Sequence, residues 1–430
     1  MNATTTIRRF FIAAVLSLAA MNFCGCGESA NSVASPDKSG DSAQPTENGG
    51  DSVEEMTPQV RNYCERFRDI LDNGPTVMIR GETPRIEVVH SDGRPHLIIP
   101  TDVGLEELAQ IEDPTKIQEV RFYRIDVTDA GLVHLKKLAN IRKLSLAYSQ
   151  VTDAGLVCLK DLAELRELRL SRTRVTDAGL VHLKGLNNLR VLELAHTLVT
   201  DAGLMHLKEL TNLRALQLSF TQVTRAGLVH LNGLTNIRSL YLNDTDVTDA
   251  QLVRLQKLTG LDELVLSSTQ VTDAGLIHVK EMSNLRSLYL IQTQVTDAGL
   301  VHLKEMSDLQ SLNVSYTQVT DAGLIHVKEM SNLRSLHLSF TKVTDAGLVH
   351  LEKLTGLHEL TLSHTQVTDV GLGTLKGLTN IQVLDLHRTQ VTDAGLEHLK
   401  GFTEMQELDL GRTLVTDAGL VHLRGLTNIQ

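Results

Sequence analysis

Histidine recurs at one slot of a strict 24-residue period, and imidazole is a frequent metal ligand that also titrates near neutral pH. The slot belongs to near-copies of the decapeptide VTDAGLVHLK, which occur thirteen times between residues 127 and 424. Ten copies carry histidine: His134, His182, His206, His230, His278, His302, His326, His350, His398 and His422. An aspartate stands five positions earlier in twelve of the thirteen copies. Two interpretations are open. Either these side chains form a chemical site, such as a zinc site or a pH sensor, or they are parts of a structural framework.

The elements that carry these side chains follow from one unit, LRELRLSRTRVTDAGLVHLKGLNN (165–188). Leu168 and Leu170 alternate with a polar residue, which predicts a strand. In the segment TDAGLVHLKGL the leucines recur every three residues, which predicts one face of a helix. One such unit cannot bury its own leucines, so the units must stack on one another.

Stacking also predicts the fold class. Strands stack about 4.8 Å apart, whereas packed helices need about 8–10 Å, so a stack with strands on one edge and helices on the other must curve. We therefore predict an α/β horseshoe-shaped solenoid over residues 114–430, with parallel strands on the concave face and helices on the convex face. Thr176 is expected to cap its helix, Asp177 to lie in the first turn, and Gly179 to allow close backbone packing.

This geometry weighs against a shared metal site. A zinc ion needs imidazole nitrogens about 2.0–2.1 Å away, whereas equivalent histidines on neighbouring helices start about 8–10 Å apart. We favour packing, or a local hydrogen bond between helices, as the role of the histidines, with metal binding or pH sensing as the alternative. The repeated aspartate is interpreted as a capping residue rather than a catalytic carboxylate.

The first half of the unit resembles the leucine-rich repeat. LRELRLSRTRV (165–175) fits the pattern L-x-x-L-x-L-x-x-N/C-x-L, and the resemblance recurs in every unit over roughly residues 117–430. The TDAGL continuation is most similar to the cysteine-containing repeats of F-box-type proteins, which would imply a substrate adaptor in ubiquitin ligation. No F-box is recognisable, and the export signal described below argues against that role. Threonine replaces the usual Asn or Cys, and its hydroxyl is expected to bond neighbouring backbone in a buried turn.

Residues that differ between units are the candidates for ligand binding, because the repeated residues build the framework. Nine aromatic residues occur from position 122 onward, and two of them, Phe122 and Phe402, fall on core slots. The others fall on slots predicted to face inward: Tyr123, Tyr148, Phe220, Tyr241, Tyr289, Tyr316 and Phe340. Exposed aromatic side chains on a concave surface are typical of partner-binding faces. The predicted ligand face consists of Phe220, Tyr241, Tyr289, Tyr316, His337 and Phe340, flanked by Arg172 and Arg388; the alternative is an idle surface that tolerates variation.

The N-terminal part has three segments of different composition. Residues 1–26 have two arginines, a short apolar run and small residues around cysteine, which is typical of an export signal. They resemble a bacterial lipoprotein signal with Cys26 as the lipidated residue; Cys24 and a plain secretory signal are the alternatives. Residues 27–57 are rich in Ser, Gly, Asp and Pro, which predicts a flexible tether. Residues 58–113 predict a small cap, a helix followed by a hairpin that turns at Asp92-Gly93.

The expected function is that of an exported, membrane-anchored scaffold that binds a protein partner through its concave face. The net charge of −11 and the lack of a basic stripe argue against nucleic acid. The sequence has no HExxH, GxSxG or phosphate-loop motif, so no catalytic residue, metal or cofactor is predicted. The alternatives are a surface polysaccharide as ligand, a passive spacer and, least favoured, an enzyme within residues 58–113. The sequence ends just before a further strand, which predicts a truncated end or one covered by a partner or a second copy.

Overall fold

The computed structural model describes residues 87–91, 94–99, 117–122, 127–224 and 226–429. The predicted signal and tether, with Cys26, lie outside these residues, as do Tyr123 and most of the predicted cap. The two strands of the predicted hairpin are among the described residues. Strands β1 (Glu87–Ser91) and β2 (Arg94–Ile99) pair antiparallel, as predicted.

The described strands form one sheet of fifteen, arranged in the order of the chain. Strand β2 pairs in parallel with the first repeat strand, so the hairpin extends the sheet of the repeats. Most repeat strands have three residues, and their central leucines lie opposite one another, as Leu288 and Leu312 do. The repeat strands are β3 (Glu119–Phe122), β4 (Lys143–Ser145), β5 (Glu167–Arg169), β6 (Val191–Glu193), β7 (Ala215–Gln217), β8 (Ser239–Tyr241), β9 (Glu263–Val265), β10 (Ser287–Tyr289), β11 (Ser311–Asn313), β12 (Ser335–His337), β13 (Glu359–Thr361), β14 (Val383–Asp385) and β15 (Glu407–Asp409).

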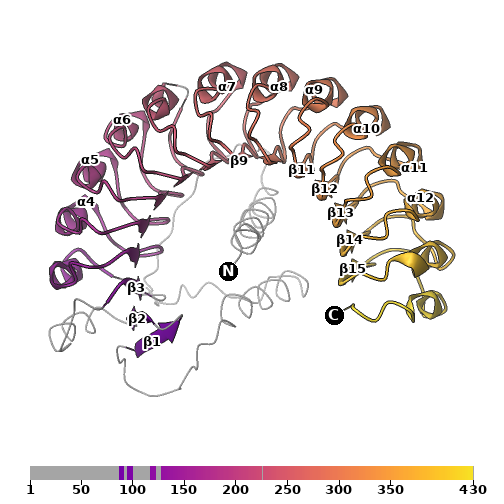
Figure 1. Ribbon diagram of the computed structural model, residues 1–430, viewed down its shortest axis with the longest axis horizontal. Coiled ribbons are helices and arrows are strands. Elements are labelled where there is room, and N and C mark those ends of the chain that lie inside the picture. The colour runs from indigo at the N-terminus through magenta and orange to yellow at the C-terminus, as the bar shows by residue number, and fades with distance from the viewer. Residues whose placement is uncertain (1–86, 92–93, 100–116, 123–126, 225, 430) are drawn as a thin grey trace, which may run out of the picture. The chain divides into compact units, whose positions relative to one another are not determined.

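Each repeat continues into a short helix, and the helices lie along the outer edge of the curved stack, with the strands along the inner edge (Figure 1). The α-helices are α4 (Asp153–Leu156), α5 (Asp177–Leu180), α6 (Asp201–Leu204), α7 (Asp249–Leu255), α8 (Asp273–Val279), α9 (Asp297–Leu303), α10 (Asp321–Val327), α11 (Asp345–Leu348) and α12 (Asp369–Leu375). The 3-10 helices are η4 (Gly131–Lys137), η5 (Val157–Leu159), η6 (Val181–Leu183), η7 (Gly227–Leu231), η8 (Val349–Leu351), η9 (Gly395–Gly401) and η10 (Gly419–Leu423). The frequent 3-10 turns suit leucines that recur every three residues, because a 3-10 helix has three residues per turn.

The core is a continuous column of leucines and valines between strands and helices. Phe122 and Phe402 are buried in it, as predicted. The predicted role of the repeated threonine is also confirmed. The buried Thr173 hydroxyl donates to the carbonyl of Leu170 at 2.6 Å, and Thr317 donates to the carbonyl of Val314 at the same distance. Since these hydroxyls are buried, the bonds satisfy polar groups that water does not reach.

The repeated aspartate has a role beyond the predicted capping. Thr296 caps helix α9, as threonine does in most repeats, but the Asp273 carboxylate of the preceding repeat also binds this threonine. Asp273 Oδ1 accepts from the Thr296 amide at 2.7 Å, and Oδ2 accepts from its hydroxyl at 2.6 Å. A methyl group at Gly299 would overlap Asp273 Oδ1. The glycine therefore makes room for a carboxylate that clamps one repeat to the next.

The single exception at the aspartate slot and the single exception at the glycine slot belong to one clamp. The aspartate is replaced by Arg225, and the glycine of the following repeat is replaced by Gln251. In the structure, Gln251 Oε1 accepts from the Thr248 amide at 2.8 Å and from the Thr248 hydroxyl at 2.7 Å. The glutamine side chain thus supplies the acceptor that an aspartate at position 225 would have provided.

Candidate functional site

The residue three positions beyond the end of each repeat strand from β4 to β15 adopts a left-handed backbone conformation. The φ angles at these twelve positions lie between 51° and 64°: Tyr148, Arg172, His196, Phe220, Asp244, Ser268, Gln292, Tyr316, Phe340, His364, Arg388 and Arg412. The amides of the first eleven continue the ladder into the next repeat, as Phe220 N does to the Asn243 carbonyl at 2.9 Å. Neighbours in this left-handed row therefore lie at about the 4.8 Å spacing of strands, which lets flat side chains stack.

Four successive residues of the left-handed row form stack A: Tyr148, Arg172, His196 and Phe220. The Arg172 guanidinium lies over the Tyr148 ring, with Cζ 5.5 Å from the ring centroid. Arg172 Nη2 lies 3.4 Å from His196 Nε2, and the His196 ring stacks on Phe220 with 4.1 Å between centroids. Tyr148, at the end of the stack, is 69% exposed.

Four further residues of the same row form stack B: Tyr316, Phe340, His364 and Arg388. Tyr316 stacks on Phe340 with 4.0 Å between centroids, and Phe340 stacks on His364 with 3.8 Å. Arg388 Nη1 lies 3.5 Å from His364 Nε2. The two stacks thus contain the same kinds of side chain, and both hold an arginine against a histidine that packs on phenylalanine.

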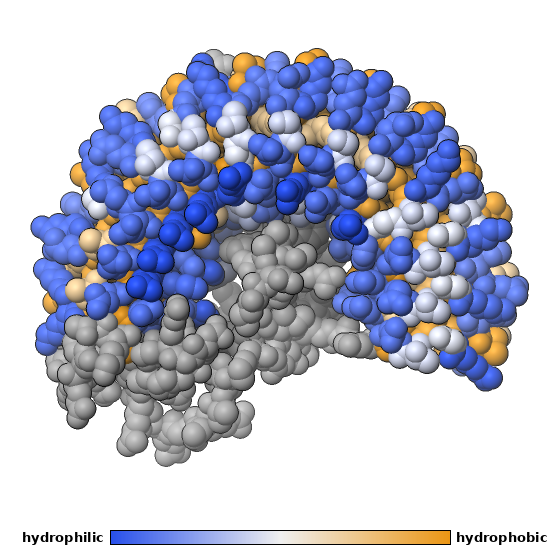
Figure 2. Space-filling model, viewed as in Figure 1, coloured by the Kyte–Doolittle hydropathy of each residue, from blue (hydrophilic) through white to orange (hydrophobic). Residues whose placement is uncertain are grey.

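Polar residues separate the stacks. Asp244, Ser268 and Gln292 occupy the left-handed row between Phe220 and Tyr316. Two acceptor atoms at the start of this gap, Asn243 Oδ1 and Asp244 Oδ2, are buried and have no hydrogen-bond partner among the described residues. Hydrophilic residues predominate on the face of the described repeats in Figure 2, and hydrophobic side chains appear between them.

The predicted ligand residues lie on two rows rather than one. Phe220, Tyr316, Phe340, Arg172 and Arg388 lie in the left-handed row, within the two stacks: Arg172 and Phe220 in stack A, the other three in stack B. The remaining three are the last residues of their strands: Tyr241 of β8, Tyr289 of β10 and His337 of β12. The predicted face therefore divides into stacks A and B and a separate strand row, which we define as the last residues of the repeat strands.

The strand row is not the open surface that the sequence suggested. Tyr289 and His337 are only 4% and 5% exposed, and Tyr241 is half-buried. Equivalent residues of a parallel ladder lie about 4.8 Å apart, so large side chains in this row pack against their neighbours. The left-handed row is more accessible, with Tyr316 at 44% and Phe340 at 37% exposure.

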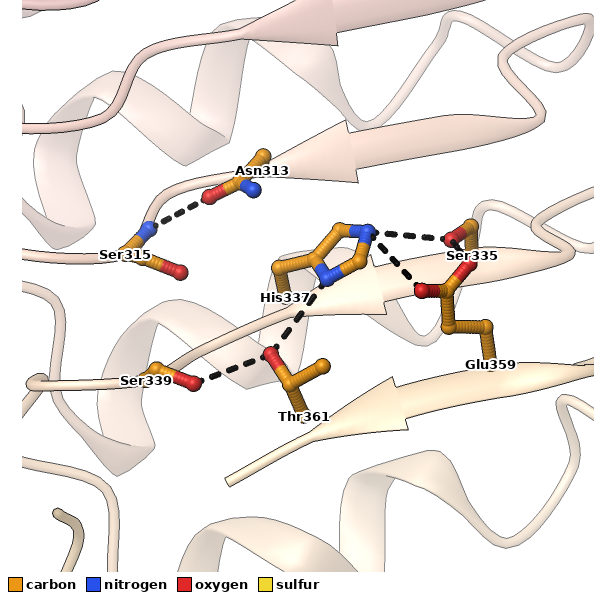
Figure 3. A network of polar contacts seen from close by, with 7 residues as sticks. All are labelled: Asn313, Ser315, Ser335, His337, Ser339, Glu359 and Thr361. Atoms are coloured by element: carbon orange, nitrogen blue, oxygen red, sulfur yellow. Dashed lines mark hydrogen bonds and ion pairs between the residues drawn. The ribbon is translucent and has the colours of Figure 1, made fainter. Parts of the chain in front are cut away.

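His337 belongs to a polar network that joins strands β12 and β13 (Figure 3). Its Nε2 lies 3.0 Å from the Ser335 hydroxyl and 4.0 Å from Glu359 Oε1, and its Nδ1 lies 3.3 Å from the Thr361 hydroxyl. Burial lowers the pKa of His337, although the Glu359 carboxylate opposes this shift. A neutral imidazole held on both nitrogens suits a structural role in the sheet.

The histidines of both stacks are also held in the neutral form. Burial, and then the charge of Arg172, lower the pKa of His196 to about 4. Burial lowers the pKa of His364 as well, and His387 and Arg412 add to this shift. At neutral pH each imidazole therefore offers its lone pair to an arginine, so it can orient the guanidinium without adding charge.

The repeated histidines of the outer helices are mostly half-exposed. Among the described residues, no three His, Cys, Asp or Glu side chains are grouped as a metal ion would require. No helix in this part of the chain is long and apolar enough to cross a membrane. The residues that sequence reasoning missed are Tyr148, His196 and His364 as members of the stacks. Their position in one slot of the 24-residue period was the available signal.

Comparison with known proteins agrees with the repeat geometry. Two family models, both described as leucine rich repeat, match the chain: one at residues 331–391 and 355–415, the other at residues 137–160 and 305–326. The chain therefore contains leucine-rich repeats. No curated protein matches its sequence significantly.

Solved leucine-rich-repeat structures share this fold. An internalin from Listeria monocytogenes is 25% identical, with a TM-score of 0.53, and the match covers 69% of this chain and 81% of the internalin. A leucine-rich-repeat protein from Leptospira interrogans is 17% identical, with a TM-score of 0.52, covering 78% of this chain and 88% of that protein. The leucine-rich-repeat solenoid is a scaffold typical of protein binding, and the fold itself implies no reaction.

Proposed function

We propose that this leucine-rich-repeat protein binds a protein partner through the left-handed row at the edge of its strand ladder. The observation that carries the proposal is the pair of stacks A and B, which place tyrosine, phenylalanine and arginine side chains in accessible positions. These residue types are enriched at the energetic centres of protein interfaces. The Leu, Val and Thr framework does not need them, because the neighbouring repeats fill the same slot with Asp244, Ser268 and Gln292.

Site-specific photo-crosslinking in the producing cell tests this proposal. A photoreactive phenylalanine analogue replaces Phe340 in one variant of the full chain and Ile325 of helix α10 in another. The two positions are matched, because Phe340 is 37% and Ile325 is 42% exposed. We expect protease-sensitive adducts from position 340 and none from position 325. Adducts from position 325 alone, or from neither position, would contradict the proposal.

We further propose that the protein acts outside the cytoplasm and is tethered to a membrane through lipidated Cys26, as the lipoprotein-like N-terminal sequence suggests. Metabolic labelling with an alkynyl fatty acid tests this part. Cys26→Ser is expected to abolish labelling, whereas the matched Cys24→Ser variant is expected to keep it. Labelling that persists in Cys26→Ser would refute the assignment of this cysteine.

A further inference from the structure

The ring faces within each stack are already occupied, which restricts the ligands that can bind there. His196 and Phe220 cover each other, and Phe340 lies between Tyr316 and His364. A sugar ring or a nucleobase binds aromatic residues by packing on their faces, and here only the outer faces of the rings at the ends of the stacks remain for such a ligand. Elsewhere a partner meets ring edges. The edge of an aromatic ring carries partial positive charge, so the accessible part of each stack favours an anionic group.

Each stack also contains an arginine positioned for an anion. Neutral histidines accept from Arg172 in stack A and from Arg388 in stack B, at 3.4 and 3.5 Å. A guanidinium has five N–H donors in a fixed plane, so one bond to histidine leaves a free pair for a carboxylate. Both arginines are exposed.

The acidic groups beside stack B, Asp385 and Asp409, end strands β14 and β15 and accept hydrogen bonds from the turns that follow these strands. Asp385 Oδ1 accepts from the His387 amide at 2.8 Å, and Asp409 Oδ1 accepts from the Gly411 amide at 2.7 Å. The imidazole of His387 also lies 3.6 Å from Asp409. Among the ion pairs of the described residues, none joins these carboxylates to Arg388.

The gap between the stacks presents hydrogen-bond acceptors, whereas the stacks present arginine donors. Among the described residues, no donor reaches the buried acceptors Asn243 Oδ1 and Asp244 Oδ2, and a buried acceptor is stabilised when a ligand N–H reaches it. The backbone of an extended peptide presents such N–H groups. Because Asp244 is acidic, it disfavours a carboxylate in the middle of the ligand.

We propose that stacks A and B bind one extended segment of a partner protein, with carboxylate side chains at Arg172 and Arg388 and an uncharged middle that donates backbone N–H groups to the gap. This inference rests on the proposed function and names the partner chemistry. Nine repeat steps of about 4.8 Å separate the two arginines, which is about 43 Å along the ladder. An extended peptide that rises about 3.4 Å per residue covers this path with about thirteen residues.

Equilibrium binding of the full chain to labelled peptides tests the inference. The probe has a Glu-Glu pair at each end of a Ser/Gly segment, with about thirteen residues between the pairs. One control peptide has Gln in place of Glu, and another keeps the Glu pairs about six residues apart. The chain has a net charge of −11, so an acidic probe is not attracted to the molecule as a whole.

We expect the probe to bind at least tenfold more tightly than either control peptide. Arg172→Gln and Arg388→Gln are each expected to weaken binding about tenfold, since each removes one charge-assisted bidentate contact. The matched control Arg334→Gln replaces an exposed arginine outside both stacks and is expected to change binding less than twofold.

Three results would overturn the inference: equal binding of the Glu and Gln peptides, equal binding of the long and short probes, or an equal loss in Arg334→Gln. Polygalacturonate that binds through Arg172 and Arg388 while the peptide does not bind would assign the stacks to an acidic glycan instead. Failure of the peptide with persistent crosslinks from position 340 would refute this ligand chemistry and leave the proposed function standing.

Discussion

The clamp between repeats predicts that Gly299 and Asp273 are energetically coupled. Gly299→Ala places a methyl group where Asp273 Oδ1 lies, so the carboxylate must leave Thr296. Two hydrogen bonds to a charged acceptor are then lost. At about 1.5 kcal/mol each, the lower end for such bonds, their loss costs about 3 kcal/mol. Alanine recovers about 1 kcal/mol of helix propensity, which leaves a net destabilisation of about 2 kcal/mol.

The same substitution is expected to behave differently once the aspartate is absent. Asp273→Ala alone should cost about 3 kcal/mol. In that background Gly299→Ala should be neutral or stabilising by up to about 1 kcal/mol, because the overlapping carboxylate is gone and only the Leu276 Cδ1 methyl, 2.9 Å from the added carbon, must shift. The predicted coupling energy is therefore about 2–3 kcal/mol. The natural sequence changes both positions of one clamp together: Arg225 replaces the aspartate and Gln251 replaces the glycine. This paired change agrees with the predicted coupling.

A double-mutant cycle measured by urea unfolding tests this coupling. Gly377→Ala is the control, because nothing lies within 4 Å of a methyl group there, and it should stay within about 0.5 kcal/mol of wild type. A repeat array can unfold in parts, so hydrogen exchange of the Thr296 amide provides a local readout and should accelerate in both single variants. An equal effect of Gly299→Ala in both backgrounds would refute the clamp.

Three further predictions concern the rows of the sheet. Ser268→Val should destabilise the chain by about 1–2 kcal/mol and Ser268→Gly should be nearly neutral, because a β-branched residue is strained at φ 55°; equal urea midpoints for the two variants would contradict this. Thr317→Val should cost about 1–2 kcal/mol, since it leaves the Val314 carbonyl without its buried donor, and an unchanged midpoint would argue against it. NMR titration should give His196 a pKa of about 4 that rises in Arg172→Gln, although burial, the larger cause, keeps it below 6.5. Between pH 6.5 and about 4 the unfolded chain binds a proton that the folded chain does not, so the free energy of unfolding should fall as pH falls through this window. A His196 titration midpoint near 6.5 in wild type would contradict the effect of burial and Arg172 on this pKa.

The period of the sequence was sufficient to predict the fold. Alternating leucines specified the strands, the spacing of three specified the helices, and the different spacings of strands and helices required curvature. The buried threonine bonds and the N-caps also followed from single residues, because those contacts lie within one repeat.

Features that depend on two repeats were harder to predict. The Asp273 carboxylate could be assigned to its own helix from the sequence, but only the register between repeats shows that it binds Thr296. The left-handed row was also missed, because Phe220 and Tyr316 are not residues that signal a positive φ. The candidate site changed for this reason: Tyr289 and His337 belong to a packed strand row, whereas Phe340 and Arg388 belong to an accessible stack.

The affinity of the full chain for the protein crosslinked at position 340 is the most direct test of the claim that the stacks are the binding surface. Wild type is compared with Tyr316→Ala/Phe340→Ala and with Ile325→Ala, and urea midpoints confirm that all three are folded. We predict at least a tenfold loss of affinity in the stack variant, since hot-spot aromatic residues contribute about 2 kcal/mol or more, and less than a twofold change in Ile325→Ala. Equal affinity of wild type and the folded stack variant would contradict the claim.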